Sequence, residues 1–172
     1  HHVIHRRQRQ MCIRDRVRGL IEHSAMPSGS ILQVIESVHS GADGTDTFTS
    51  NTSFSDSGHS LTITPKFSTS KVFVTLLGGR MSYGGSGAGS TLSVQIQASV
   101  AGGSYSAIRD VMDAYQQHST YGDVMAGSVL HSPNTTSAVI YKTQFKSGGQ
   151  NAAVYYTSSS NPVVLTAMEI AG

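Results

Sequence analysis

Residues 92–98 read Leu-Ser-Val-Gln-Ile-Gln-Ala, a strict alternation of apolar and polar side chains. Because successive side chains of a β-strand point to opposite faces, this period of two predicts a strand with one packed face and one wet face. Residues 71–77, Lys-Val-Phe-Val-Thr-Leu-Leu, are nearly continuously apolar instead. A run of this kind is typical of a central strand that is covered on both faces.

Nine β-prone runs of this kind follow one another along the chain. They are residues 31–38, 47–54, 61–64, 71–77, 92–98, 124–130, 138–145, 153–156 and 163–170. Gly, Ser, Asn, Asp and Pro separate them, and long helical patterns are missing from this part of the sequence. The regular spacing predicts an all-β fold of about nine strands, an antiparallel β-sandwich that resembles a jelly roll. A parallel α/β fold needs helices between its strands and is therefore disfavoured.

One segment does not fit the strand pattern. Ile108, Val111 with Met112, and Tyr115 recur at intervals of three and four residues. Such spacing places apolar side chains on one face of a helix. We therefore expect a short helix or a long ordered loop near residues 107–117.

The chain is low in charge and rich in hydroxyl groups. Charged residues make up 13% of its 172 residues, against roughly 25% in an average protein, whereas 27 Ser and 15 Thr are present. The net charge of +2 combines +5 in residues 1–19 with −3 in residues 20–172. A mildly acidic body predicts no nucleic-acid binding. No apolar run reaches the ~18–20 residues of a membrane helix, so membrane insertion is not expected.

The basic residues lie in a head, residues 1–25, which we expect to be non-native or disordered. Its string Gln10–Arg16 (QMCIRDR) resembles a peptide found at the ends of metagenomic reading frames where a sequencing adapter has been translated. A basic arm for anionic surfaces and a structural helix remain alternatives. The expected natural start is Met26, and residues 26–172 are expected to form a single β-sandwich domain. Cys12, the chain's one cysteine, lies in the head and predicts no internal disulfide.

Familiar catalytic motifs are missing from the sequence. The loop Gly84–Gly89 has no Lys-Ser or Lys-Thr after it, so it is not a phosphate-binding loop. A nucleophile elbow needs glycine two residues after its serine, and the residue two positions after Ser86 is Ala88. We expect no catalytic residue, no cofactor and no metal.

Tyrosine residues gather between positions 103 and 123, together with Gln, Arg and His. Tyrosine gives a recognition surface a large contact area at a low cost in conformational entropy. The alternative, that these rings cover the edge of the core or a subunit seam, stays open. The candidate receptor-binding or glycan-binding residues are Tyr105, Arg109, Tyr115, Gln116, Gln117, His118 and Tyr121.

Several strings in the body resemble those of a family of small phage virion proteins, the tail-fibre-like structural proteins common among marine phages. Residues 29–34 (GSILQV) open the series, and residues 54–65 (FSDSGHSLTITP) follow. Residues 68–74 (STSKVFV) are similar to the family's SSKVLV strand. Residues 132–142 (SPNTTSAVIYK) are similar to its DSPGTTSAVTYK segment, and residues 165–170 (LTAMEI) match its end.

The resemblance covers residues 28–171 and depends on the order and spacing of these strings. It implies a β-sandwich in the virion that acts in assembly and in attachment to the host surface, without catalysis. The implied partners are two further copies in a homotrimer, other virion proteins, and a glycan or protein of the host cell surface. The implied location is the virion, after synthesis in the cytoplasm of a bacterial host.

Two other functions remain open. The first is a carbohydrate-binding or carbohydrate-active module whose site is the segment 103–123. Asp110 and Asp113 are the closest pair of carboxylates there, with His118 nearby, and glycosidases use paired carboxylates. The second is a head decoration protein of the same fold.

Overall fold

The computed structural model describes residues 26–40, 47–49, 51–84, 90–116, 123–148, 152–156 and 161–172. These residues form ten β-strands. The strands are β1 (Ile31–His39), β2 (Thr47–Thr49), β3 (Ser55–Ile63), β4 (Lys71–Gly84), β5 (Ser90–Val100), β6 (Ser106–Gln116), β7 (Asp123–His131), β8 (Val139–Ser147), β9 (Ala152–Tyr156) and β10 (Val163–Ile170).

The strands form two antiparallel sheets. Sheet A has the order β1-β10-β4-β9-β2 with β7 also paired to β4, and sheet B has the order β3-β8-β5-β6. Met81 of β4 pairs with Tyr155 of β9 and with Asp123 of β7, so β9 lies opposite β7, on the side of β4 that β10 occupies. In the same way β2 continues the line of β1, because the two strands pair with β9 and β10. The ten strands therefore fill eight positions, four in each sheet.

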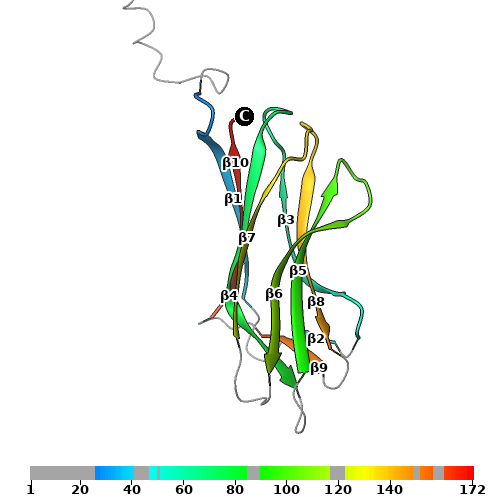
Figure 1. Cartoon of the computed structure of the whole chain (residues 1–172). Helices are drawn as coiled ribbons and strands as arrows, with labels where there is room; N and C mark the ends of the chain where they lie inside the picture. The colour runs from blue at the N-terminus through cyan, green and yellow to red at the C-terminus, as the bar shows by residue number, and fades with distance from the viewer. Residues whose placement is uncertain are drawn as a thin grey trace, which may run out of the picture.

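These eight positions have the connectivity of a jelly roll. Along the chain, the first position pairs with the eighth (β1–β10), the second with the seventh (β3–β8), the third with the sixth (β4–β7) and the fourth with the fifth (β5–β6). The chain is thus one long antiparallel hairpin, with its tip at residues 101–105, wound until the two sheets face each other (Figure 1). The expected antiparallel β-sandwich of jelly-roll type is confirmed.

A glycine pair marks the place where β9 gives way to β10. Gly78 and Gly79 have φ values of +99° and +59°, and the register of β4 against β7 shifts between Gly78 and Met81. The Gly79 N–H donates to the Pro162 carbonyl oxygen at 3.0 Å, just before β10 begins. A Cβ added at Gly78 would lie 2.3 Å from that same oxygen. Glycine therefore allows the close approach that aligns β10 with β4.

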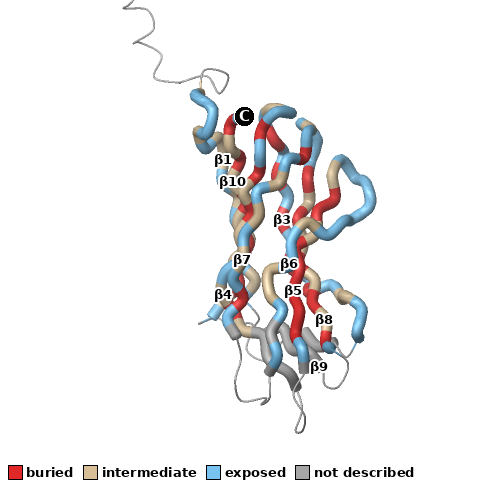
Figure 2. The backbone as a smooth tube through the Cα atoms, viewed as in Figure 1, coloured by how far each residue is buried: buried red, intermediate tan, exposed pale blue. Residues whose placement is uncertain are grey.

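The core lies between the sheets, and buried residues alternate with more exposed ones along β3 and along residues 71–77 of β4 (Figure 2). Strands β8 and β10 alternate without a break between buried and half-buried residues. The largest fully buried apolar side chains include Leu76, Ile96, Tyr141, Phe145 and Leu165. Complete burial of such a side chain stabilises a fold by about 1.5–3 kcal/mol.

The expected helix or loop near residues 107–117 is wrong: the segment is strand β6, the tenth strand that the pattern missed. Its pairing with β5 shifts register at Val94/Gln95 and again at Ile96/Gln97. A β-bulge adds one residue to a strand, so residues on one face become three apart instead of two. Ile108 and Val111 both pack against the core for this reason, and their spacing imitates a helix.

The nine expected runs are all represented by strands, with altered bounds: residues 47–54 divide between β2 and the approach to β3. The expected head, residues 1–25, lies outside the described residues. In the part of the chain that the structure describes, no helix is long and apolar enough to cross a membrane.

Candidate functional site

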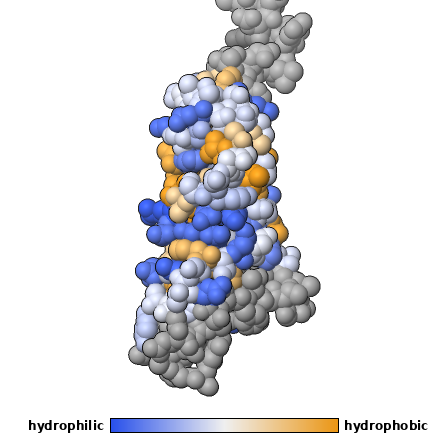
Figure 3. Space-filling view, turned by 90° about the vertical axis from the view of Figure 1, so that its right-hand side faces the viewer, coloured by the Kyte–Doolittle hydropathy of each residue, from blue (hydrophilic) through white to orange (hydrophobic). Residues whose placement is uncertain are grey.

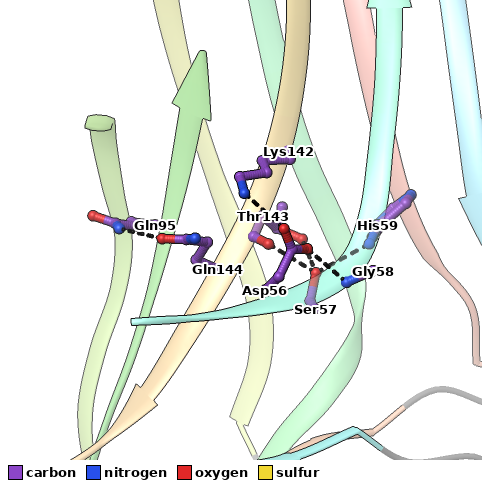
Figure 4. A network of polar contacts seen from close by, with 8 residues as sticks. All are labelled: Asp56, Ser57, Gly58, His59, Gln95, Lys142, Thr143 and Gln144. Carbon is purple, nitrogen blue, oxygen red and sulfur yellow. Dashed lines mark hydrogen bonds and ion pairs between the residues drawn. The ribbon is translucent and has the colours of Figure 1, made fainter. Parts of the chain in front are cut away.

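The outer face of sheet B is strongly polar, and hydrophilic side chains form a broad band across the middle of it (Figure 3). The strand register aligns Asp56, Gln144, Gln95 and Asp110 in one row across the four strands. Within the row, the Gln95 Nε2 donates to the Gln144 Oε1 at 3.1 Å (Figure 4). This amide pair is a polar contact between the two central strands of the sheet.

The outer side of β5 is not the wet face that the alternation predicted. Gln95 and Ser93 are buried, with 5% and 7% of their surface exposed. Each bonds to a side chain on a neighbouring strand, Gln95 to Gln144 and Ser93 to the Asp113 Oδ1 at 2.9 Å. The neighbours thus cover a central strand that would otherwise face water.

An ion pair joins the strands β3 and β8 on the same face. The Lys142 Nζ lies 2.6 Å from the Asp56 Oδ2 and 4.1 Å from the centre of the Tyr105 ring. The Gly58 N–H donates to the Asp56 Oδ1 at 2.9 Å. Partial burial alone would raise the pKa of Asp56, but the hydrogen bonds from Lys142 and Gly58 and the charge of Lys142 outweigh it, and the pKa lies below its usual value.

Beneath the ion pair, a hydroxyl pair links β3 to β8. The Ser57 Oγ donates to the Thr143 carbonyl oxygen at 2.9 Å and lies 2.5 Å from the Thr143 Oγ1. The His59 N–H donates to the Ser57 Oγ at 3.2 Å (Figure 4). Ser57 and Thr143 are both buried, and the hydrogen bonds between them provide the partners that buried polar groups require.

His59 connects the two sheets. Its Nε2 lies 2.9 Å from the Ser37 carbonyl oxygen of β1, and its ring stacks on the ring of His39 with the centroids 5.2 Å apart. Burial lowers the pKa of His59, and the positive charge that His39 can carry lowers it further, against the opposing bond to Ser37. The Nδ1 of His59 is buried without a hydrogen-bond partner. Burial of the ring between the sheets therefore favours its neutral form over the charged one.

Glu169 is the one fully buried acid among the described residues, and it stabilises a turn. Its Oε1 accepts hydrogen bonds from the N–H groups of Lys66 at 2.7 Å and of Phe67 at 3.4 Å. Its Oε2 accepts one from the Gln33 Nε2 at 2.5 Å. The carboxylate of Glu169 on β10 thus accepts hydrogen bonds from β1 and from the turn after β3, and it links these three parts of the chain.

Four of the seven predicted binding residues are described, and they lie at or beside the free edge of sheet B. Tyr105 precedes β6, and both Arg109 and Tyr115 are exposed on β6. Gln116 ends β6, opposite Ser90. Gln117, His118 and Tyr121 lie outside the described residues. The structure therefore places three of the seven predicted residues on one edge strand, and it joins Tyr105 to Lys142 of β8.

The outer face of sheet A has a different character, which the sequence reasoning missed. The strand register arranges it in three rows across β1, β10, β4 and β7. The Val34 row is apolar and consists of Val34, Met168, Phe73 and Leu130. The Glu36 row is polar and consists of Glu36, Thr166, Thr75 and Ser128. The Val38 row is apolar and consists of Val38, Val164, Leu77 and Ala126.

No group of three or more His, Cys, Asp or Glu side chains in the described ranges is arranged to hold a metal ion. The acids whose contacts are given above bond instead to protein donors: Asp56 to Lys142, Asp113 to Ser93, and Glu169 to the turn after β3. Carboxylates held in this way stabilise a fold. The two outer faces are accordingly the surfaces on which a function can be built.

No known family model matches this chain, and no curated protein is similar to it in sequence. Among solved structures it is similar to a structure of the infectious bursal disease virus Gt strain, with 15% identity and a TM-score of 0.48. It is also similar to a VP2 subviral particle of the same virus, with 16% identity and a TM-score of 0.41. Both matches cover 83% of this chain and 39% of the other, so the chain spans about two fifths of the length of these structures.

Proposed function

We propose that this chain is a structural protein of a phage virion, of tail-fibre type, which acts in assembly and host-surface attachment and is not an enzyme. The observation that carries the proposal is the ordered resemblance of residues 28–171 to phage virion proteins, on a chain with jelly-roll connectivity. Jelly rolls are common in viral structural proteins and in lectins. Because a fold alone does not define a function, the sequence resemblance decides between these classes.

The positions of the resembling strings in the fold support the proposal. Residues 29–34, 165–170 and 68–74 fall on or beside β1, β10 and β4, which are adjacent in sheet A. They meet in register, with Ile31 opposite Ile170 and Ile170 opposite Lys71. Strings that are far apart in sequence thus build one end of one sheet.

The proposed assembly is a homotrimer that also contacts other virion proteins. Sheet A ends in the edge strands β1 and β7, and sheet B ends in β3 and β6. Unpaired edges invite uncontrolled association, and a closed cyclic oligomer is one means of covering them. The protein is proposed to be made in the cytoplasm of a bacterial host and to reside in the virion.

The location in the particle is tested with gold-labelled antibodies against the purified chain. Phage particles that carry the gene are labelled and imaged by electron microscopy. Label on the tail supports the tail-fibre proposal. Label confined to the head identifies a decoration protein instead, and particles without label refute a surface role in the virion.

For attachment, the proposed receptor-binding surface is the edge of sheet B at β6. Tyr105, Arg109 and Tyr115 are exposed there, next to the polar row of the same face. Aromatic rings beside hydrogen-bonding amides suit the apolar and polar faces of a sugar ring. A host-surface glycan is therefore the proposed ligand.

Glycan binding is tested with the variants Tyr115→Ala and Arg109→Ala on a glycan array. Thr62→Ala is a control, because Thr62 is also exposed but lies on β3, at the opposite edge of sheet B. We expect at least a tenfold loss of affinity in the two β6 variants and none in the control, because one lost stacking or hydrogen-bonding contact costs about 1.4 kcal/mol or more. Equal binding by all three variants would remove β6 from the site.

A further inference from the structure

The outer face of sheet A is unusually apolar for a surface in contact with water. Eight large hydrophobic side chains are exposed among the described residues, and six of them belong to this face. These six are Ile31, Val34, Val38, Leu77, Val124 and Leu130. Single exposed hydrophobic residues are ordinary, whereas a contiguous patch marks an interaction surface.

The three rows of the face are nearly without charge, and the row of Ile31 and Ile170 at one end of them also carries Lys71. Of the twelve side chains in the three rows, Glu36 is the single ionisable one. The outer face of sheet B differs, because it carries Asp56, Lys142, Lys146 and Asp113. The two sides of the sandwich are therefore built for different surroundings, and sheet A is the side that gains most from leaving water.

We infer that the outer face of sheet A packs against the same face of other copies of this chain, around an axis parallel to its strands. The number of copies, three, rests on the proposed function. In the ring, the β1 edge of each copy meets the β7 edge of the next. The three rows of each copy then become three layers of a shared core.

The row pattern favours identical copies over an unrelated partner. Rotation about an axis parallel to the strands leaves every row at its own height. The Val34 row of one copy therefore meets the Val34 row of the next, and the Val38 row meets the Val38 row. Apolar side chains meet apolar ones and hydroxyl groups meet hydroxyl groups, without further adjustment. An unrelated partner would need a second surface with the same stripes at the same spacing.

The one charge within the three rows fits this arrangement. Glu36 lies on the edge strand β1, and the residue of its row on the opposite edge is Ser128 of β7. When β1 of one copy meets β7 of the next, each Glu36 carboxylate faces a serine hydroxyl that can donate a hydrogen bond. A packing that turned the strands end for end would bring Glu36 against Glu36, which like-charge repulsion disfavours.

The size of the face is sufficient for an assembly only when all copies of the ring are counted together. Four strands about 4.8 Å apart, over about eight residues of roughly 3.4 Å each, give about 500 Å² per copy. In a ring of three, each face is shared between two neighbours, so the three faces together bury about 1,500 Å², or about 500 Å² for each pair of copies. Flanking residues such as Ile31 and Val124 add to this area.

The first test measures the mass of the full chain in solution by light scattering at micromolar concentration. We expect three times the chain mass of 18.2 kDa for the wild type, and the monomer mass for Leu77→Asp. Leu77 lies at the centre of the Val38 row with 60% of its surface exposed, so the monomer tolerates aspartate there. The matched control is Tyr115→Asp, which alters an equally exposed residue of sheet B and should remain trimeric.

The second test uses disulfide cross-linking in a Cys12→Ser background, because Cys12 is the one native thiol. Val34→Cys and Leu130→Cys are the two edges of the Val34 row and should meet between copies. Their combination should give covalent trimers on a non-reducing gel, and each single variant should give none. The matched control combines Ser60→Cys with Ala107→Cys, the two exposed edge residues of one row on sheet B, and should stay monomeric on the gel.

The outcomes separate this inference from the proposed function. If covalent dimers are the largest product, the outer face of sheet A is the interface, but the assembly is not a trimer. A wild-type trimer that keeps its mass in Leu77→Asp and forms no cross-link would refute the surface and leave the trimer standing. A monomer at every concentration would refute both the trimer and this packing, while the place of the protein in the virion would still be decided by labelling.

Discussion

Replacement of Gly78 by alanine tests how β10 is aligned in sheet A. Gly78 has a φ of +99°, and a Cβ there would lie 2.3 Å from the Pro162 carbonyl oxygen. Gly58 has a similar φ of +77°, but a Cβ there meets nothing within 4 Å. The two substitutions therefore share the cost of a positive φ, and Gly78→Ala alone adds a clash with the backbone.

The expected magnitudes follow from these two terms. A left-handed conformation costs an L-residue about 1–2 kcal/mol, which is the whole effect expected for Gly58→Ala. Overpacking against a fixed neighbour adds about 1–3 kcal/mol, so Gly78→Ala should lower the free energy of unfolding by about 2–5 kcal/mol in all. With a urea m-value of about 2 kcal/mol/M, the midpoints of the two variants should differ by about 1 M.

Urea unfolding followed by far-UV circular dichroism measures this difference. All samples need the same protomer concentration, because association stabilises the folded state by mass action. The wild type provides the reference midpoint. If Gly78→Ala proves no more destabilising than Gly58→Ala, Gly78 does not set the approach of β10 to β4, and the described junction of β9 and β10 is wrong.

Three further changes test the polar contacts. Glu169→Gln replaces an acceptor oxygen facing Gln33 with a donor, so the free energy of unfolding should fall by about 1–3 kcal/mol; an unchanged urea midpoint would contradict the role given to Glu169. Burial lowers the pKa of His59 and of His131, so the unfolded chain binds more protons below about pH 6.5 and stability should fall as the pH decreases through this value. The stability of the double variant His59→Gln/His131→Gln should depend less steeply on pH. A dependence as steep as that of the wild type would show that these two histidines do not cause it. Lys142→Met should raise the pKa of Asp56 in an NMR titration and cost at most about 1 kcal/mol, since the ion pair is partly exposed; an unshifted pKa would show that Lys142 is not what lowers it.

Alternation within single strands made most of the fold predictable from the sequence. Residues 92–98, 138–145 and 163–170 all lie in strands that alternate between the core and an outer face. Strand β6 was missed because two bulges changed its period from two to three. A bulge depends on the partner strand, which a local pattern does not reveal.

The candidate surfaces were harder to predict, because each depends on the register between distant strands. Val34 and Met168 are neighbours on sheet A although they are far apart in the sequence. One signal was present in residues 71–77, where apolar side chains occupy both faces of a strand. Phe73 and Leu77 of this run belong to the outer rows, so the run indicated an apolar outer face as well as a core, although Leu77 is exposed in the structure.

The partner of Tyr105 was likewise hidden from the sequence. The pairing of β8 with β5, and of β5 with β6, brings Lys142 level with Ala107 at the start of β6. This register lets the Lys142 Nζ lie over the Tyr105 ring. The binding edge predicted from tyrosine content alone therefore gains a cation from another strand, which composition does not show.

The virion role is tested most directly by the protein content of the particles themselves. Phage particles that carry the gene are purified by density gradient, and their peptides are identified by mass spectrometry. The proposed function predicts peptides of β1, β4, β8 and β10 in the particle fraction, in constant proportion to the major virion proteins across the gradient. Peptides found only in the soluble fraction of the lysate would contradict it.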